Sequence, residues 1–190
     1  MTDPRIERTR QAVMDAATCL LMEGGPTAVT VDAVVARSGV AKSTMYRHWA
    51  TRDELVAAMF THLVPSFEVP AEGLGFEDSL RALVGSVVQH MSGEQFRKTV
   101  PALLMLKTRH QEIAEVEEQL HAQQQSVFDE VFRRGEVEGR VPATVDRELL
   151  LTLLVGPLMM AMMFESVPLG DELVERTVAQ FLAGLAVASE

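Results

Sequence analysis

The feature that most limits the fold of this chain is the spacing of its apolar residues. Within residues 4–23, apolar side chains recur at three-, four- and seven-residue intervals, which places them on one face of an α-helix: Ile6, Val13, Ala17, Leu20 and Leu21. Similar spacing continues through most of the 190 residues, and no run of alternating apolar and polar residues indicates a β-strand. The sequence therefore predicts an all-α protein.

Glycine and proline mark the breaks between helices and between two domains. Gly24-Gly25-Pro26 ends the first helix, and residues 65–75 contain two prolines and two glycines. We therefore predict a smaller domain over residues 1–64 and a larger domain over residues 65–190. After the first helix we expect further helices at 30–37, 41–48, 51–64, 76–91, 94–107, 111–138, 145–165 and 171–188, or about nine in all.

Charge is divided unevenly between these two domains. The chain has a net charge of −10 at pH 7, with 17 Lys and Arg against 27 Asp and Glu. Residues 1–64 hold seven basic and seven acidic residues, which leaves ten basic and twenty acidic residues in 65–190. An N-terminal domain without net charge can approach a polyanion that the acidic C-terminal domain would repel.

Neither a disulfide nor a membrane span is expected. The single cysteine, Cys19, has no internal partner, which is typical of a reducing compartment, and we expect its thiol to be packed against the first helix's neighbours. The most apolar run, residues 149–164, is sixteen residues long, shorter than the roughly 20 that cross a membrane, and Gly156-Pro157 interrupts it. We therefore expect a buried helix there, in a cytoplasmic protein without a membrane partner.

Residues 30–48 predict two short helices joined by a turn, which is a helix-turn-helix arrangement. Thr30 can cap the first helix, Gly39 supplies the turn, and no acidic residue occurs from Ser38 to Arg52. A small apolar core would hold the second helix with its hydroxyls and cations outward. That core is expected to contain Val34, Val35, Val40, Met45 and Trp49.

A helix of this size fits the major groove of DNA, where its first residues meet base edges and phosphates. The next helix begins with a capping box, Thr51 to Glu54, and its free N–H groups favour a further phosphate beside Arg52. The candidate DNA-binding residues are Thr30, Lys42, Ser43, Thr44, Tyr46, Arg47, His48 and Arg52.

The stretch VDAVVARSGVAKSTMYRHWATRDELVAAMF, residues 31–60, resembles the DNA-binding module of the TetR family of bacterial transcription regulators. The matching features are the glycine turn, the Lys-x-Thr-x-Tyr run, Trp49, and the hydroxyl, basic and acidic residues that open the fourth helix. The resemblance implies a repressor in which Thr44, Tyr46 and His48 contact DNA and Lys42 and Arg52 contact phosphates. Ala41 departs from the pattern, because the family often has a serine cap there.

The same resemblance implies that residues 65–190 form a helical domain for ligand binding and dimerisation. The predicted helix at 145–165 is apolar nearly all round, so we expect most of its faces to be buried. Its methionines can adapt to apolar ligands of varied shape. The candidate ligand-binding residues are Met91, Phe96, Leu103, Met105, Phe128, Phe132, Met159, Met162 and Met163.

The last predicted helix carries several small residues, which allow close approach of a second helix. Since the family dimerises through its last two helices, the resemblance implies a homodimer with Gly156, Ala179, Ala183 and Gly184 in the interface. Two helix-turn-helix units related by a two-fold axis would read a palindromic operator in double-stranded DNA.

Two other classes of function compete with this interpretation. A small-molecule enzyme would need an acid–base or metal constellation, but the histidines are scattered and no HExxH or CxxC occurs, so no catalytic residue, metal or cofactor is expected. A protein-interaction module could keep the helix-turn-helix shape without binding DNA, although the retained Lys42, Thr44, Tyr46 and Arg47 argue against this. The sequence is therefore best interpreted as a ligand-responsive DNA-binding regulator.

Overall fold

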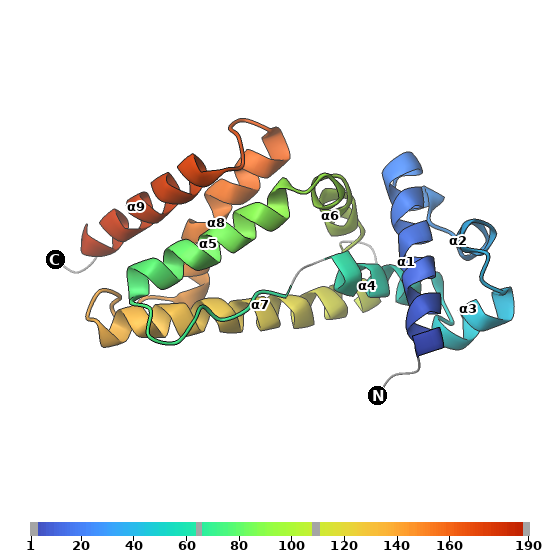
Figure 1. Cartoon of the computed structure of the whole chain (residues 1–190), viewed down its shortest axis with the longest axis horizontal. Helices are drawn as coiled ribbons and strands as arrows, with labels where there is room; N and C mark the ends of the chain where they lie inside the picture. Colours follow the sequence, from blue (N-terminus) through green and yellow to red (C-terminus); the bar gives the residue numbers. More distant parts are fainter. Residues whose placement is uncertain (1–3, 64–65, 108–110, 188–190) are drawn as a thin grey trace. The chain divides into compact units, whose positions relative to one another are not determined.

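The computed structural model describes residues 4–63, 66–107 and 111–187, and every regular element in these ranges is helical (Figure 1). The all-α prediction is confirmed, and the predicted helix ends agree with the observed ones to within two residues. The elements are α1 (Pro4–Gly24), a short 3-10 helix η1 (Pro26–Ala28), α2 (Val31–Ser38), α3 (Lys42–His48), α4 (Arg52–Leu63), α5 (Phe76–Ser92), α6 (Glu94–Lys107), α7 (Gln111–Val137), α8 (Arg147–Phe164) and α9 (Asp171–Val187).

The chain forms two compact units. The first consists of residues 1–65 together with 98–120, and the second of residues 66–97 together with 121–190. The stretch 98–120 belongs by sequence to the larger predicted domain, yet its Ala102 packs against the apolar core of the first unit.

The first unit is built around one face of α1. Val13, Met14 and Ala17 of α1 are fully buried, and they share a core with residues of α2, α3 and α4. The apolar core predicted for the helix-turn-helix is confirmed: Val34, Met45 and Trp49 are buried, and Val35 and Val40 pack against them in part. The expectation for Cys19 is wrong, because its side chain is exposed on the outer side of α1.

The second unit has a continuous core formed by α5, α7, α8 and α9. Aromatic residues lie at its centre, where the rings of Phe132 and Phe181 stack with their centroids 5.9 Å apart. In Figure 1, α5 and α8 lie next to α9, and each contributes a buried apolar stripe to this core. The buried stripe of α8 consists of Leu150, Leu151, Leu154, Leu158, Ala161 and Met162.

The opposite side of α8 corrects an expectation from the sequence. Leu153 and Met160 are each 58% exposed and Phe164 is 67% exposed, so this helix is not buried on most of its faces within one chain. The core of the second unit has room for one stripe of α8, and the remaining apolar residues face outward. Length and composition alone would let Arg147–Phe164 cross a membrane, but helices from the cores of globular proteins meet the same criteria.

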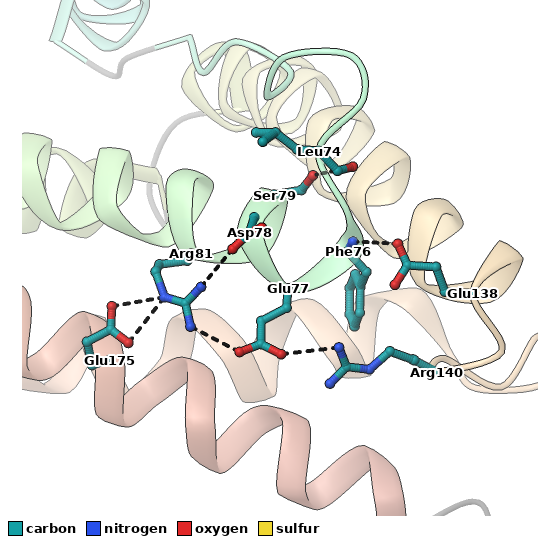
Figure 2. A network of polar contacts seen from close by, with 9 residues as sticks. All are labelled: Leu74, Phe76, Glu77, Asp78, Ser79, Arg81, Glu138, Arg140 and Glu175. Carbon is teal, nitrogen blue, oxygen red and sulfur yellow. Dashed lines mark hydrogen bonds and ion pairs between the residues drawn. The ribbon is translucent and has the colours of Figure 1, made fainter.

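A network of charged residues fixes the start of α5 to the other elements of the second unit (Figure 2). Arg81 of α5 pairs with Glu77 on its own helix and with Glu175 of α9, each at 3.0 Å. Glu77 also accepts a hydrogen bond of 3.2 Å from Arg140, which follows α7. Hydrogen bonds from the guanidinium of Arg81, which has the larger effect, and from that of Arg140 hold the pKa of Glu77 below its usual value.

Candidate nucleic-acid interface

The turn between α2 and α3 is set by local hydrogen bonds. Thr30 caps α2, since its hydroxyl accepts a 3.2 Å hydrogen bond from the backbone N–H of Ala33. At the other end, Gly39 has a φ of 68°, a left-handed conformation that a residue with a Cβ adopts at a cost, and its N–H donates to the Val35 carbonyl. The chain can therefore turn directly from α2 into α3.

Buried residues on one side of α3 fix the direction of its polar side chains. Met45 is fully buried, and Trp49 follows the helix as a second buried anchor whose N–H donates to the Met45 carbonyl at 2.8 Å. The tyrosine that the sequence analysis placed at the interface, Tyr46, is 47% exposed although its ring is apolar. Thr44 is half-buried, and the other polar residues of α3 are exposed: Lys42, Ser43, Arg47 and His48.

Lys42, at the start of α3, already has an acidic neighbour. Its ammonium lies 2.6 Å from the carboxylate of Asp32, which comes from the first turn of α2. The hydrogen bond to Asp32 is the main reason that the pKa of Lys42 is raised above its ordinary value. The same ammonium lies 5.9 Å from the centre of the Tyr46 ring, so a cation and an aromatic face come together at this end of the helix.

Arg52 has partners that the sequence analysis did not anticipate. Its Nε donates to the Val29 carbonyl at 2.7 Å and its Nη2 donates to the Pro26 carbonyl at 2.6 Å. These bonds tie the start of α4 to the η1 segment, 23 and 26 residues earlier in the chain. The predicted phosphate contact of Arg52 would have to form beside these bonds or replace them.

The caps of α3 and α4 agree with the sequence analysis. Ala41 precedes α3 without a side-chain cap, as its methyl group requires. The Thr51 hydroxyl accepts a hydrogen bond of 3.1 Å from the Glu54 N–H, which is the first half of the expected capping box. The Glu54 carboxylate completes it by accepting from the N–H of Ala50 at 2.7 Å, one residue before the usual position.

The structure places the predicted ligand-binding residues in three different environments. Four of them belong to the buried core of the second unit, namely Met91, Phe128, Phe132 and Met162, while Phe96 and Met159 pack against that core in part. Met163 departs from the expectation, because its side chain is 52% exposed on the outer face of α8. The side chains of Leu103 and Met105 lie outside the described residues.

One cavity of the second unit, about 370 Å³ in volume, lies at the C-terminal end of α8. Met162 is the predicted ligand-binding residue that contributes to the cavity wall. The charged residues of the cavity, Arg97 and Glu165, were not among the predicted ligand-binding residues. Sequence spacing gives little sign of this site, since Arg97 and Glu165 are far apart in the chain.

The predicted interface residues lie on the outer side of the second unit. Ala179, Ala183 and Gly184 of α9 are exposed, and Gly156 of α8 is half-buried. The exposed apolar residues of α8 recur at intervals of three, four and seven, so they form a stripe on one face of that helix: Leu149, Leu153, Met160, Met163, Phe164 and, just beyond it, Val167.

Comparison with known proteins decides what this helix-turn-helix and its companion unit are. Residues 13–59 match the family described as "Bacterial regulatory proteins, tetR family". Residues 70–181, more than half of the chain, match the family described as "Tetracyclin repressor-like, C-terminal domain". The chain belongs to the TetR family.

Individual proteins resemble this chain over different shares of its length. An uncharacterized HTH-type transcriptional regulator of Mycobacterium tuberculosis is 27% identical over 179 residues, which cover 93% of this chain and 88% of that protein. An HTH-type transcriptional repressor of the same species, Rv3405c, is 40% identical over 57 residues, 30% of each chain. The structure of the fatty acid degradation regulator FadR from Bacillus halodurans shares the fold with a TM-score of 0.72, at 18% identity, and the match covers 92% of this chain and 98% of that one.

Membership of the TetR family confirms the class of function predicted from the sequence. The protein is a DNA-binding transcriptional regulator of the helix-turn-helix type, and it belongs to a family that is not enzymatic. Binding to a DNA operator follows from the family.

Proposed function

We propose that this TetR-family protein is a homodimeric, ligand-responsive repressor that acts in the cytoplasm and leaves a palindromic operator when a small apolar or amphipathic ligand binds. Residues 1–64 serve as its DNA-binding domain and residues 65–190 as its domain for ligand binding and dimerisation. The observation that carries the proposal is the outer face of α3, where hydroxyls, cations and an exposed tyrosine gather on a helix held by buried Met45.

The residues of this face divide between base edges and phosphates. Thr44, Tyr46 and His48 enter the major groove, where hydroxyl, phenol and imidazole groups can meet base edges. Thr30, Ser43, Lys42 and Arg47 contact the phosphates on either side, which set the register of the helix on the duplex. Arg52 adds to the phosphate contacts either beside its bonds to the carbonyl groups of Pro26 and Val29 or in place of them.

A second copy of the chain covers the exposed stripe of α8. Leu153 and Met160 are more than half exposed, and with their neighbours they form an exposed apolar stripe. An exposed apolar surface of this kind marks an interaction site, whereas a single exposed apolar residue does not. On α9, the exposed Ala179, Ala183 and Gly184 allow a neighbouring helix to approach closely. A two-fold axis through these helices would bring together the same patch of both chains and present two α3 helices to one palindrome.

Ligand response follows from linkage between two arrangements of the dimer. A ligand shifts the protein toward the arrangement that it binds more tightly, and it lowers operator affinity only if that arrangement fits the operator poorly. A coupling free energy of about 1–3 kcal/mol would reduce operator affinity roughly 5- to 150-fold. Similarity over 57 residues to a named repressor supports the negative sign of regulation.

Selection of genomic DNA fragments by the purified protein, followed by transcription in vitro from the selected promoters, tests this function. We expect enrichment of one palindromic sequence and less transcript when the protein is added. Enrichment of single half-sites would contradict the dimeric operator, and more transcript on addition of the protein would show activation in place of repression. A protein that enriches no sequence would contradict operator recognition itself.

A further inference from the structure

The cavity at the end of α8 is open to solvent and has the volume of a small-molecule site. Its volume of about 370 Å³ lies near the lower end of the range typical of ligand pockets. Buried Ala161 and Met162 of α8 contribute an apolar wall, and Pro168 and Leu169 extend it from the segment that leads into α9. An apolar body of modest size therefore fits this space.

Arg97 and Glu165 give the cavity its charged groups. Arg97 Nη1 lies 3.8 Å from Glu165 Oε1, which is beyond hydrogen-bonding distance, and no other ionic partner of Arg97 occurs among the residues described. The side chain of Glu165 is 76% exposed and that of Arg97 is 39% exposed. The carboxylate therefore lies mostly in solvent, while the guanidinium is the less exposed of the two groups at the cavity wall.

The backbone at Glu165 fixes where α8 ends. This residue ends α8 with a φ of 48°, and it is the only non-glycine residue with a positive φ in the described part of the chain. A left-handed residue is a common way to end a helix, and here it turns the chain from α8 into the segment that leads to α9. Glu165 lines the cavity at this point, and its exposed carboxylate is the ionic partner of Arg97 at 3.8 Å.

We propose that this cavity binds a small amphipathic anion, with its carboxylate on Arg97 and its apolar body against Met162 and Leu169. A carboxylate can accept two parallel hydrogen bonds from a guanidinium, which is a stronger contact than the present ion pair. Arg97 belongs to the first turn of α6, where the partial positive charge of a helix N-terminus favours an anion. A cationic ligand would depend on Glu165, whose charge is largely screened by water.

The regulatory part of this inference rests on the proposed function and uses the continuity of α6. Residues up to Arg97 belong to the second unit, whereas residues 98–107 of the same helix belong to the first. Ala102 of α6 packs against the apolar core that also holds Met45 of α3. We expect an anion at Arg97 to lower operator affinity if it binds more tightly to the arrangement of the repressor that fits the operator poorly.

Isothermal titration calorimetry with decanoate tests the site, with decanol and decylamine as probes that share the alkyl chain but carry a neutral or a cationic head. We expect decanoate alone to bind with measurable affinity. Arg97→Gln should weaken that binding at least tenfold, by about the worth of a charged hydrogen bond. Glu165→Gln should tighten it about two- to fivefold, because the competing exposed ion pair is lost.

Two further variants separate binding from folding. Arg133 is another surface arginine, and it pairs with Glu130 at 2.7 Å. The Arg133→Gln variant should therefore bind decanoate as the wild type does. Arg97→Lys keeps the positive charge without the two-donor geometry and should retain part of the affinity. Thermal melts of all variants without ligand show whether each is folded.

The outcomes distinguish this inference from the proposed function. Preference for decylamine, or decanoate binding that survives Arg97→Gln in a folded protein, would overturn the anion site. If the wild type binds its operator while decanoate neither binds nor releases it, the anion site fails and the repressor proposal stands. If decanoate binds through Arg97 but no operator is bound at all, the anion site stands and the repressor proposal fails.

Discussion

The Lys42 ammonium lies 2.6 Å from the Asp32 carboxylate, so the first cation of α3 pairs with an acid of α2 on the surface that is proposed to face DNA. Both side chains are more than half exposed. Asp32 therefore repels the phosphates that Lys42 would attract, and it competes with them for the same ammonium. This acid is expected to limit how tightly the regulator holds any duplex.

Asp32→Asn should strengthen binding to operator and to unrelated duplex by about two- to fivefold, since an exposed ion pair is worth at most about 1 kcal/mol. Fluorescence anisotropy with both duplexes measures the change. In a Lys42→Gln background the same substitution should have a smaller effect, because the pair is already broken. Equal effects in the two backgrounds would show that Asp32 acts without Lys42.

Arg52→Gln should lower the stability of the first unit more than it lowers operator affinity. The substitution removes hydrogen bonds from a guanidinium to the carbonyl groups of Pro26 and Val29, at a cost of about 2 kcal/mol. Arg37→Gln, which breaks an exposed pair with Glu23, is the matched control and should cost less. An unchanged melting temperature with a tenfold loss of operator affinity would instead make Arg52 a phosphate contact.

Leu153→Glu or Met160→Glu should convert the protein to a monomer. Either substitution places two like charges at the centre of the proposed two-fold interface, where they would be desolvated without a partner. Light scattering at micromolar concentration should show half the wild-type mass, and operator affinity should fall with it. Val137→Glu is the control, because Val137 is a 77% exposed apolar residue of α7 outside this stripe. A dimer that tolerates both charges would place the interface elsewhere.

Gly135→Ala should destabilise the second unit by about 1–3 kcal/mol, the usual cost of overpacking a core. A Cβ at this position would lie 2.5 Å from Val141 Cγ2 and 3.0 Å from ring atoms of Phe76. Gly85→Ala is the control, since its Cβ would meet nothing within 4 Å and alanine favours a helix. Chemical denaturation should therefore give opposite signs for the two substitutions, and equal losses would contradict the close packing at Gly135.

The network at the start of α5 should make the protein sensitive to acid. Arginine partners depress the folded-state pKa of Glu77 below its usual 4.5, so the pairing stabilises the fold above that pH and is lost as the pH falls through the lower folded value. The gap in melting temperature between wild type and Glu77→Gln should narrow from pH 7 to pH 3. Glu68→Gln, which removes an exposed carboxyl outside the network, should have a melting temperature close to that of the wild type at either pH. A constant gap for Glu77→Gln would contradict this linkage.

Sequence patterns were sufficient for the helices and for the small core beneath α3. Periodicity and caps such as Thr30 and Thr51 act over a few residues, so they can be read without knowledge of the fold. The partners of Lys42 and Arg52 could not be predicted in this way, because Asp32 and the carbonyl groups of Pro26 and Val29 approach only when the first unit folds.

The burial of α8 was mispredicted for a related reason. Both of its faces are apolar, so the pattern cannot tell which face enters the core of its own chain and which is left for another molecule. Arg97 and Glu165 were missed because neither belongs to a motif and the cavity between them depends on where α8 ends. Surface pairs and cavities thus require the three-dimensional arrangement, whereas helices and local caps do not.

Fluorescence anisotropy on duplex DNA from the region upstream of the gene, over a series of salt concentrations, tests most directly whether α3 is the DNA-reading element. Wild-type protein should bind tightly, and the log–log dependence of affinity on salt should have a slope of about −0.9 for each phosphate contact. Lys42→Ala should make that slope shallower, and Tyr46→Ala should reduce the preference for this duplex over unrelated DNA. Wild-type affinity and salt dependence in both variants, on this duplex and on the sequences selected from the genome, would contradict recognition through α3.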